Sequence, residues 1–375
     1  MLLDYDIEQP DGCQTHNLKV FGLDLRLKKN CIMKKKLNLV FLSNANGGIA
    51  TFQSNLINFL HEKKIKTCLF DQINNQTFFS INKKKNIKTF YSNVLKEIKL
   101  TIKHLSKIKN SSILNIFIIS NPVILLIYFF PIKLMFRKNR IIFFHHSHIM
   151  KNTLYEYFIG YLTTLFKIFV DKTVYVSKFT KEWWRKFFFV NRFLKSKIIF
   201  NSTEKIKIKI KNHNKITVGF IGRFDREKGI DKFLMYAKKS NLKNLNFIIF
   251  GDGNLKSLIP KKNKNIKLYN WSSKNFIYSQ IDILFVTSEI ENCPFTVIEA
   301  KSLGIPTITT SKGGINEIIK NNHDGIILKK NAKIIEINNS ILKIINKYQI
   351  YRKNCLINSK KFSKKNQEKI LKLFL

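Results

Sequence analysis

Two carboxylates, Glu291 and Glu299, lie eight residues apart in a segment that changes from strand-like to helix-like character. The apolar run Ile283–Val286 predicts a buried strand, and Pro294 suits the first turn of a helix over residues 295–303. Both carboxylates can therefore face the crevice beyond the strand ends, where open α/β sheets bind ligands. If all intervening residues were helical, they would be about 12 Å apart, which suits two ends of an extended ligand better than one acid–base pair. Spacing alone favours the simpler interpretation of a solvated loop charge and an exposed helical charge.

Two other places have the residue types that bind phosphates. Arg223 and Lys228 follow a predicted strand over residues 217–221, and they can converge on a pyrophosphate, the guanidinium by paired hydrogen bonds and the ammonium as a point charge. Gly47 and Gly48 stand between a predicted strand and a predicted helix, where backbone N–H groups can approach an anion. Alternatively, Arg223 and Lys228 are ordinary surface charges, and Gly47 and Gly48 only form a turn. The chain has no G-x-G-x-x-G dinucleotide-binding pattern.

A third candidate is the histidine-rich end of the strand predicted over residues 140–144. His145, His146 and His148 follow one another there. Zinc would require further ligands, and the five cysteines and remaining histidines form no matching set. We choose His146 and His148 as site residues and expect the side chain of His145 to be satisfied inside the sheet. It stays open which of these three histidines faces a ligand.

The segment 283–317 resembles the E-x7-E region of family 4 (group 1) GT-B glycosyltransferases, and residues 222–229 resemble that family's donor-phosphate motif. The resemblance implies that Glu291 meets the donor sugar and Glu299 the ribose hydroxyls of the nucleotide. It implies further donor-binding residues and a catalytic-site histidine: Gly47, Gly48, Arg223, Lys228, Gly251, Phe295 and Thr296 for the donor, and His146 or His148 close to the sugar. The family more often has glycines where Asn292, Cys293 and Pro294 stand, which affects contacts to the sugar more than contacts to the nucleotide.

The resemblance also implies the fold class, α/β of the GT-B type, with two Rossmann-like domains whose parallel sheets face a central cleft. The acidic and polar residues 1–32 differ in character from the rest of the chain, so we interpret them as a non-native or disordered leader and Met33 as a candidate start. The expected divisions are 33–204 for the acceptor domain, 205–214 for a lysine-rich linker, 215–352 for the donor-nucleotide domain, and 353–375 for a helix that crosses back to the first domain.

Two local expectations concern the second domain. Trp271 is expected to serve packing more than contact with a nucleotide base. Residues 315–320 are expected to begin a helix, and Glu317 in its first turn would suit the positive end of the helix dipole.

The chain of 375 residues is strongly basic, with 67 Lys and Arg against 24 Asp and Glu and a formal net charge of +43. Such a field favours anionic partners, although lysines spread over solvated faces by coding bias give the same count. The cysteine pattern indicates a reducing cytoplasm. The apolar region 113–136 is broken by Ser120, Asn121 and Pro122, so each part is shorter than the roughly 20 residues of a membrane span.

A helix over residues 178–189 interleaves basic and aromatic residues, and two interpretations of it stay equal: an interfacial helix on an anionic membrane, or a core helix. The predicted location is peripheral, on the inner face of the cytoplasmic membrane.

The predicted function is retaining transfer of a sugar from a nucleotide-sugar to a hydroxyl of a lipid-linked saccharide in bacterial surface-polysaccharide assembly. No metal or cofactor is expected. The resemblance implies front-side attack, since no carboxylate is identified as a protein nucleophile. The alternatives are another GT-B enzyme, such as a sugar-nucleotide epimerase or phosphorylase, and a non-catalytic basic protein on membrane or nucleic acid. No motif that reads RNA or DNA supports nucleic-acid binding.

Overall fold

The computed structural model describes most of the chain, namely residues 37–42, 47–63, 114–120, 122–135, 139–147, 153–204, 206, 208, 215–260 and 265–374. The predicted leader, most of the predicted linker and His148 lie outside the described residues. Backbone contacts place residues from Leu37 onward in one compact unit.

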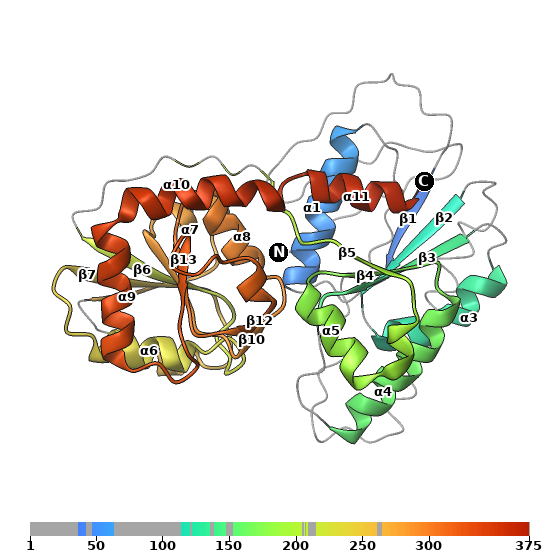
Figure 1. Ribbon diagram of the computed structural model, residues 1–375, viewed down its shortest axis with the longest axis horizontal. Coiled ribbons are helices and arrows are strands. Elements are labelled where there is room, and N and C mark those ends of the chain that lie inside the picture. Colours follow the sequence, from blue (N-terminus) through green and yellow to red (C-terminus); the bar gives the residue numbers. More distant parts are fainter. Residues whose placement is uncertain are drawn as a thin grey trace. The chain divides into compact units, whose positions relative to one another are not determined.

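The first part of this unit is a five-stranded sheet in the order β1-β2-β3-β4-β5, and every pair is parallel (Figure 1). Its strands are β1 (Leu37–Leu42), β2 (Leu114–Ile119), β3 (Asn139–His145), β4 (Lys172–Tyr175) and β5 (Ser196–Ile198). Its helical elements are α1 (Gly48–Glu62), α3 (Pro122–Met135), α4 (Leu154–Phe166), η1 (Lys167–Phe169), α5 (Lys178–Phe187) and η2 (Phe189–Arg192).

Side chains of β2 and β3 alternate between two cores, because successive residues of a strand point to opposite faces. Ile116 and Ile142 face α1, whereas Phe117 and Phe143 face α3. Both faces are apolar, as expected for a parallel sheet covered by helices on each side. No helix among the described residues has both the length and the apolar character required to cross a membrane.

The second part is a six-stranded parallel sheet in the order β13-β11-β9-β6-β7-β8. Its strands are β6 (Ile216–Ile221), β7 (Leu245–Phe250), β8 (Ile266–Tyr269), β9 (Ile283–Val286), β11 (Thr307–Thr309) and β13 (Gly325–Ile327), and β10 (Ile290–Glu291) pairs separately with β12 (Lys312–Gly313). Its helical elements are α6 (Ile230–Lys239), η3 (Lys256–Leu258), α7 (Lys274–Ser279), α8 (Phe295–Ser302), η4 (Gly314–Glu317), α9 (Ile334–Asn346) and α10 (Tyr348–Ser359).

The strand order of this second sheet locates a crevice. The chain proceeds outward from β6 through β7 to β8, and then returns to place β9 on the other side of β6. The loops that leave β6 and β9 therefore diverge at a topological switch point, which is where doubly wound sheets bind ligands. The predicted phosphate motif follows β6, and Glu291 follows β9.

The end of the chain returns to the first sheet after η5 (Lys360–Phe362). Gln367 in α11 (Lys365–Phe374) donates a hydrogen bond to the Asn55 carbonyl of α1 over 2.8 Å, and Ile370 and Phe374 lie in the core that includes Phe52. The predicted division after residue 352 falls inside α10, which continues to Ser359. The helix that packs on the first sheet is the later one, α11.

The structure limits one local expectation and contradicts another. Trp271 has 53% of its surface exposed, so it does not lie in the core. Instead of a helix over residues 315–320, the chain forms the short 3-10 helix η4, because Gly313 has a φ of +102° and the chain soon turns toward β13. Glu317 still serves a helix N-terminus, but that of α5: its carboxylate accepts from the N–H groups of Lys178 and Phe179 at 2.9 and 2.6 Å.

Candidate functional site

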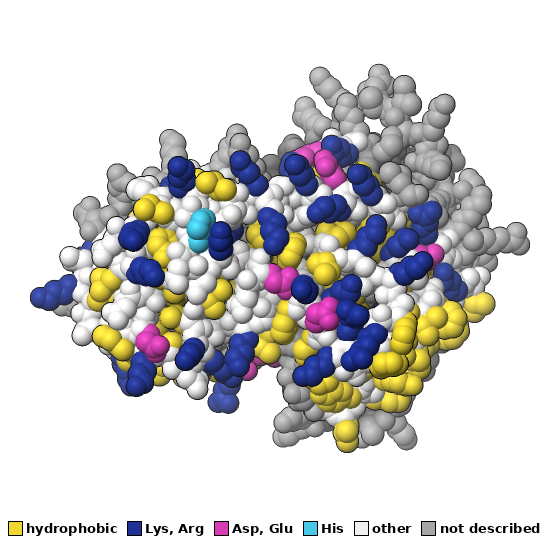
Figure 2. Space-filling view, viewed as in Figure 1, with side chains coloured by type: hydrophobic (Ala, Val, Ile, Leu, Met, Phe, Trp, Pro, Cys, Tyr) yellow, Lys and Arg dark blue, Asp and Glu magenta, His cyan; other side chains and the backbone are white. Residues whose placement is uncertain are grey.

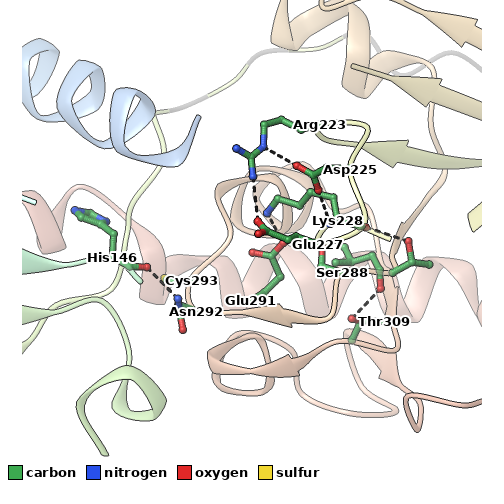
Figure 3. A network of polar contacts seen from close by, with 12 residues as sticks. His146, Arg223, Asp225, Glu227, Lys228, Ser288, Glu291, Asn292, Cys293 and Thr309 are labelled. Atoms are coloured by element: carbon green, nitrogen blue, oxygen red, sulfur yellow. Dashed lines mark hydrogen bonds and ion pairs between the residues drawn. The ribbon is translucent and has the colours of Figure 1, made fainter. Parts of the chain in front are cut away.

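The centre of the site is an ion pair at the switch point. Nζ of Lys228, in the loop after β6, lies 2.6 Å from Oε1 of Glu291, which follows β9 (Figure 3). The hydroxyl of Ser288 donates to the same carboxylate oxygen over 2.7 Å. Only 12% of the Glu291 side chain is exposed, against 32% of the Lys228 side chain. The carboxylate is thereby fixed in position while the ammonium keeps access to solvent.

Backbone contacts hold the lysine loop against β9. The hydroxyl of Thr287 donates to the carbonyl of Gly229 over 2.7 Å. Gly229 has a φ of +70°, and a Cβ added to it would lie 2.1 Å from the Thr287 carbonyl oxygen. Only glycine fits at such a position, so the close approach that brings Lys228 to Glu291 depends on it.

Arg223 lies beside this pair and is held by two carboxylates of its own loop. Its guanidinium Nε is 3.1 Å from Asp225, and Nη2 is 3.5 Å from Glu227 (Figure 3). The side chain is 58% exposed. Ion pairs this exposed contribute little energy, so an incoming anion can compete for the guanidinium.

Glu299, on α8, is buried in its own polar contacts. Nζ of Lys274 lies 2.6 Å from one carboxylate oxygen, and the hydroxyl of Tyr278 donates to the other over 2.7 Å. Glu299 is only 4% exposed, which contradicts the simpler interpretation of an exposed helical charge. Burial, and then the neighbouring Glu299 carboxylate, raise the pKa of the Tyr278 phenol well above its usual range, so Tyr278 remains a hydrogen-bond donor.

The two described histidines at the end of β3 have different environments. His145 lies within the first part of the chain, where its Nε2 is 3.1 Å from the buried Nζ of Lys167. His146 lies between the rings of Phe52 and Phe144, and its Nε2 is buried without a hydrogen-bond partner among the described residues. Burial lowers the pKa of His146 to about 4, so its imidazole is neutral near pH 7.

The His146 backbone is joined to the loop of Glu291. Asn292 donates from its side-chain amide to the carbonyl of His146 over 3.1 Å (Figure 3). The next residue, Cys293, is also joined to the first part, because the Asn201 amide donates to its carbonyl over 2.7 Å. Asn292 and Cys293, which stand where the resembling family more often has glycines, thus join the loop of Glu291 to the first part of the chain by hydrogen bonds.

The glycines predicted to bind the donor have separate surroundings. Gly48 begins α1, and a Cβ added to it would lie 3.8 Å from the ring of Phe295 at the start of α8. No described neighbour lies within 4 Å of a Cβ added to Gly47. A Cβ at Gly251 would lie 1.9 Å from the Gly222 carbonyl oxygen, so this glycine serves the approach of two loops.

Phe295 and Thr296, two residues predicted to bind the donor, have different surroundings. Phe295 is 8% exposed and contributes to the core that includes Phe52. The carbonyl of Thr296 accepts from the hydroxyl of Tyr278 over 3.3 Å, which places Thr296 beside Glu299.

Several polar residues of the site were missed by sequence reasoning. Ser288, Lys274, Tyr278 and Asn292 each contact a predicted site residue or its backbone. Ser288 and Asn292 lie within three residues of Glu291, so proximity in sequence was an available signal. Lys274 and Tyr278 lie more than twenty residues before Glu299, and only the fold brings them to it.

Within the described residues, no three His, Cys, Asp or Glu side chains gather as a metal site would require. What the site does offer is an exposed arginine, a partly buried lysine, a glycine-rich helix start and two carboxylates in fixed positions. Such an arrangement can bind a diphosphate between the cations and present acceptors to hydroxyl groups on either side of it.

Comparisons with known proteins identify relatives of part of the chain. Residues 201–362 match the family model described as glycosyl transferases group 1. A Klebsiella pneumoniae protein described as an uncharacterized 41.2 kDa protein in the cps region is 27% identical over 162 residues, covering 39% of this chain and 45% of the relative. A Campylobacter jejuni α-1,4-N-acetyl-D-galactosaminyltransferase, named for an undecaprenol diphosphate-linked saccharide, is 30% identical over 118 residues, covering 29% and 33%. The matches thus span less than half of each relative.

The fold is also found among solved structures. Anabaena HepE in complex with UDP-glucose superimposes with a TM-score of 0.66 at 13% sequence identity, covering 90% of this chain and 98% of that one. At this identity the likeness concerns the fold, and it extends over both parallel sheets. Residues 201–362 match the glycosyl transferases group 1 family model, and the chain has the GT-B fold.

Proposed function

We propose that the protein transfers a sugar, with retention at the anomeric carbon and without a metal, from a nucleotide-sugar to a hydroxyl of a lipid-linked saccharide. The observation that carries the proposal is the pairing of Lys228 with Glu291 at the switch point, with Arg223 beside them. It brings cations for a leaving diphosphate and an acceptor for a sugar hydroxyl to one place.

Binding of the donor follows from these contacts. The diphosphate takes Arg223 from its exposed carboxylate partners and interacts with Lys228 as well. The Gly47–Gly48 turn at the start of α1 adds backbone N–H groups and the positive end of the helix dipole. Glu299 accepts hydrogen bonds from the ribose, which competes with Lys274 for the carboxylate.

The transfer step then needs groups that stabilise the charge on the leaving diphosphate, and it needs no nucleophile from the protein. As the bond from the anomeric carbon to the diphosphate oxygen breaks, charge grows on that oxygen beside Arg223 and Lys228. The acceptor oxygen forms its bond on the same face of the sugar, and its proton passes to the leaving phosphate oxygen. Glu291 is already bonded to Lys228 and Ser288, so we assign it to orienting a sugar hydroxyl. The buried Nε2 of His146 has no partner among the described residues, and the backbone of His146 is joined to the same loop.

The biological setting is bacterial surface-polysaccharide assembly at the cytoplasmic face of a membrane. Support comes from the Klebsiella relative in a cps region and from the Campylobacter relative, whose name describes a lipid-linked saccharide. A basic chain of formal charge +43 would be attracted to an anionic membrane on which such an acceptor lies.

The first test is a thermal-shift screen of the full chain against UDP, GDP, ADP and CMP and their common sugars. One nucleotide is expected to raise the melting temperature, because a ligand that binds only the folded state stabilises it. Arg223→Ala should remove the shift. Arg185→Ala is the matched control, since Arg185 also pairs with a carboxylate of its own helix but belongs to α5. No shift with any nucleotide, or an equal shift in Arg223→Ala, would contradict the donor site.

A further inference from the structure

Helix α4 has its apolar face on the outside. Leu154, Phe158 and Tyr161 recur at helical spacing and are 89%, 59% and 54% exposed. The buried face of the same helix consists of Gly160, Thr163 and Thr164. A surface helix of a globular protein normally shows the reverse arrangement, with apolar residues toward the core.

The inward polar face is satisfied by a buried network. Nζ of Lys167 contacts His145 and the side-chain oxygen of Asn191, and the Asn191 amide donates to the hydroxyl of Thr164 over 3.0 Å. Burial lowers the pKa of Lys167 well below its usual value. The hydrogen bond from Asn191 to Thr164 holds the polar side of α4 inward, and the apolar side faces outward.

The apolar side of α4 continues onto its neighbours. Phe130 of α3 is 58% exposed, and its ring centroid is 5.6 Å from that of Phe166 at the end of α4. Leu134 and Phe169 add side chains that are 84% and 64% exposed. We call the surface formed by Phe130, Leu134, Leu154, Phe158, Tyr161 and Phe169 the α3–α4 face. Figure 2 shows hydrophobic side chains gathered over α3 and α4, with lysines and arginines nearby.

The charge around this face is basic. Described residues 122–198 contain eleven lysines and arginines and three carboxylates. Asp171 pairs with Lys133 at 3.6 Å, and Glu182 pairs with Arg185 at 3.1 Å. Few carboxylates remain to offset the lysines.

These observations distinguish between possible occupants. A second copy related by a two-fold axis would bring the same basic surface against itself, and like charges would oppose that contact. A bilayer with anionic headgroups complements both the apolar side chains and the surrounding lysines. α3 and α4 have 14 and 13 residues, too short to cross a bilayer, so they suit a position within its surface.

We propose that the α3–α4 face docks on an anionic lipid surface. The proposal rests on the lipid-linked acceptor of the proposed function and names the surface that brings the site to it. It also moves the interfacial role away from α5, because Trp184 and Phe188, two aromatics of the segment predicted to be interfacial, are buried among their neighbours.

The test is co-sedimentation of the full chain with vesicles of phosphatidylcholine alone or of phosphatidylcholine with phosphatidylglycerol. The wild type is expected to sediment with the anionic vesicles and to be released by salt, since screening weakens the electrostatic part. The double variant Phe158→Ser, Tyr161→Ser should bind roughly tenfold more weakly because it loses apolar area at the interface.

The matched control is Ile335→Ser, Ile350→Ser, which removes two side chains of similar exposure, 61% and 58%, from α9 and α10. It should bind vesicles as the wild type does. Thermal unfolding of each variant verifies that it folds. Failure of the wild type to sediment, or equal sedimentation of the Phe158, Tyr161 variant, would overturn the proposal. So would a dimer without lipid that this variant converts to a monomer, because a second copy would then occupy the face.

The nucleotide thermal shift on the same samples separates the two proposals. If the wild type does not bind vesicles but a nucleotide raises its melting temperature, only the docking proposal is refuted. Vesicle binding without any nucleotide shift would refute only the sugar-transfer function.

Discussion

Nζ of Lys228 and Oε1 of Glu291 lie 2.6 Å apart, although 63 positions separate the two residues in the chain. The cation expected to bind the donor phosphates and the carboxylate expected to bind the donor sugar are thus one ion pair. Any diphosphate that approaches Lys228 competes with Glu291 for the ammonium. The affinity for the nucleotide and the rate of transfer are therefore linked through this pair.

Glu291→Gln should separate the two. The amide keeps the shape of the side chain but gives up the charge that holds Lys228, so binding of the nucleoside diphosphate should be unchanged or tighter. Transfer should fall by roughly a hundredfold, because a fixed charged acceptor at the reacting sugar is lost. Calorimetry gives the affinity, and product formation gives the rate.

Ser288→Ala serves as the control for Glu291→Gln. It removes one hydrogen bond from the carboxylate and leaves the ion pair, so its effect on transfer should be much smaller. Weaker nucleotide binding in Glu291→Gln with an unchanged rate would contradict the roles assigned to Glu291 and Lys228.

Glu299→Gln should weaken nucleotide binding about tenfold, since a hydrogen bond to a charged acceptor contributes about 1.5 kcal/mol or more. Tyr278 can still donate to the amide oxygen, so the helix α8 should remain folded. A dideoxy analogue of the same nucleotide, which has no ribose hydroxyls, should bind the wild type and the variant equally. Equal weakening with both ligands would show that Glu299 acts by another route.

Glu317→Ala should lower the free energy of unfolding by about 1 to 2 kcal/mol, which is typical for loss of a helix N-terminal acceptor. The reason is that Lys178 and Phe179 lose the carboxylate that accepts from their N–H groups. Denaturant unfolding measures the change. Glu289→Ala is the control, because Glu289 is 49% exposed and pairs only with partly exposed lysines. A Glu317 variant as stable as the Glu289 variant would show that the contact contributes nothing.

The pH dependence of stability should contain a term from His146. Burial lowers its pKa to about 4, against about 6.5 when unfolded. Between these values the unfolded chain binds more protons than the folded chain, so stability rises with pH across this window and is constant above it. The full term is about 3 kcal/mol, at about 1.4 kcal/mol for each unit of pKa.

His146→Leu should remove this term, which is measured as the difference between the unfolding free energies of the two proteins from pH 4 to 7. Lys167→Met is a useful contrast. Burial lowers the pKa of Lys167, so this residue makes stability depend on pH between that lowered pKa and the ordinary value of 10.5. Above pH 6.5, of the two variants only Lys167→Met should therefore change the slope of the unfolding free energy against pH. A difference between wild type and His146→Leu that does not vary with pH would contradict a buried neutral imidazole.

Several local elements, and the two motifs that they carry, can be predicted from the sequence. The apolar run that forms β9 and Pro294 before α8 are signals between near neighbours, so these elements can be predicted without the fold. The glycine Gly229 can be recognised in the same way, but its contact with Thr287 is formed only in the fold. The resemblance to group 1 glycosyltransferases rested on these same segments, and the family match over residues 201–362 confirms it.

The pairing of charges and the exposure of helix faces depend on contacts between distant parts of the chain. Strand order places β9 beside β6, and this pairing brings Glu291 to Lys228. Glu317 reaches the N-terminus of α5 across 138 positions of sequence, and Glu299 is buried by residues of α7. The inward face of α4 likewise depends on a distant partner, the Asn191 amide that donates to Thr164. Periodicity shows that a helix has an apolar side, but it does not show which residue will bond to its polar side.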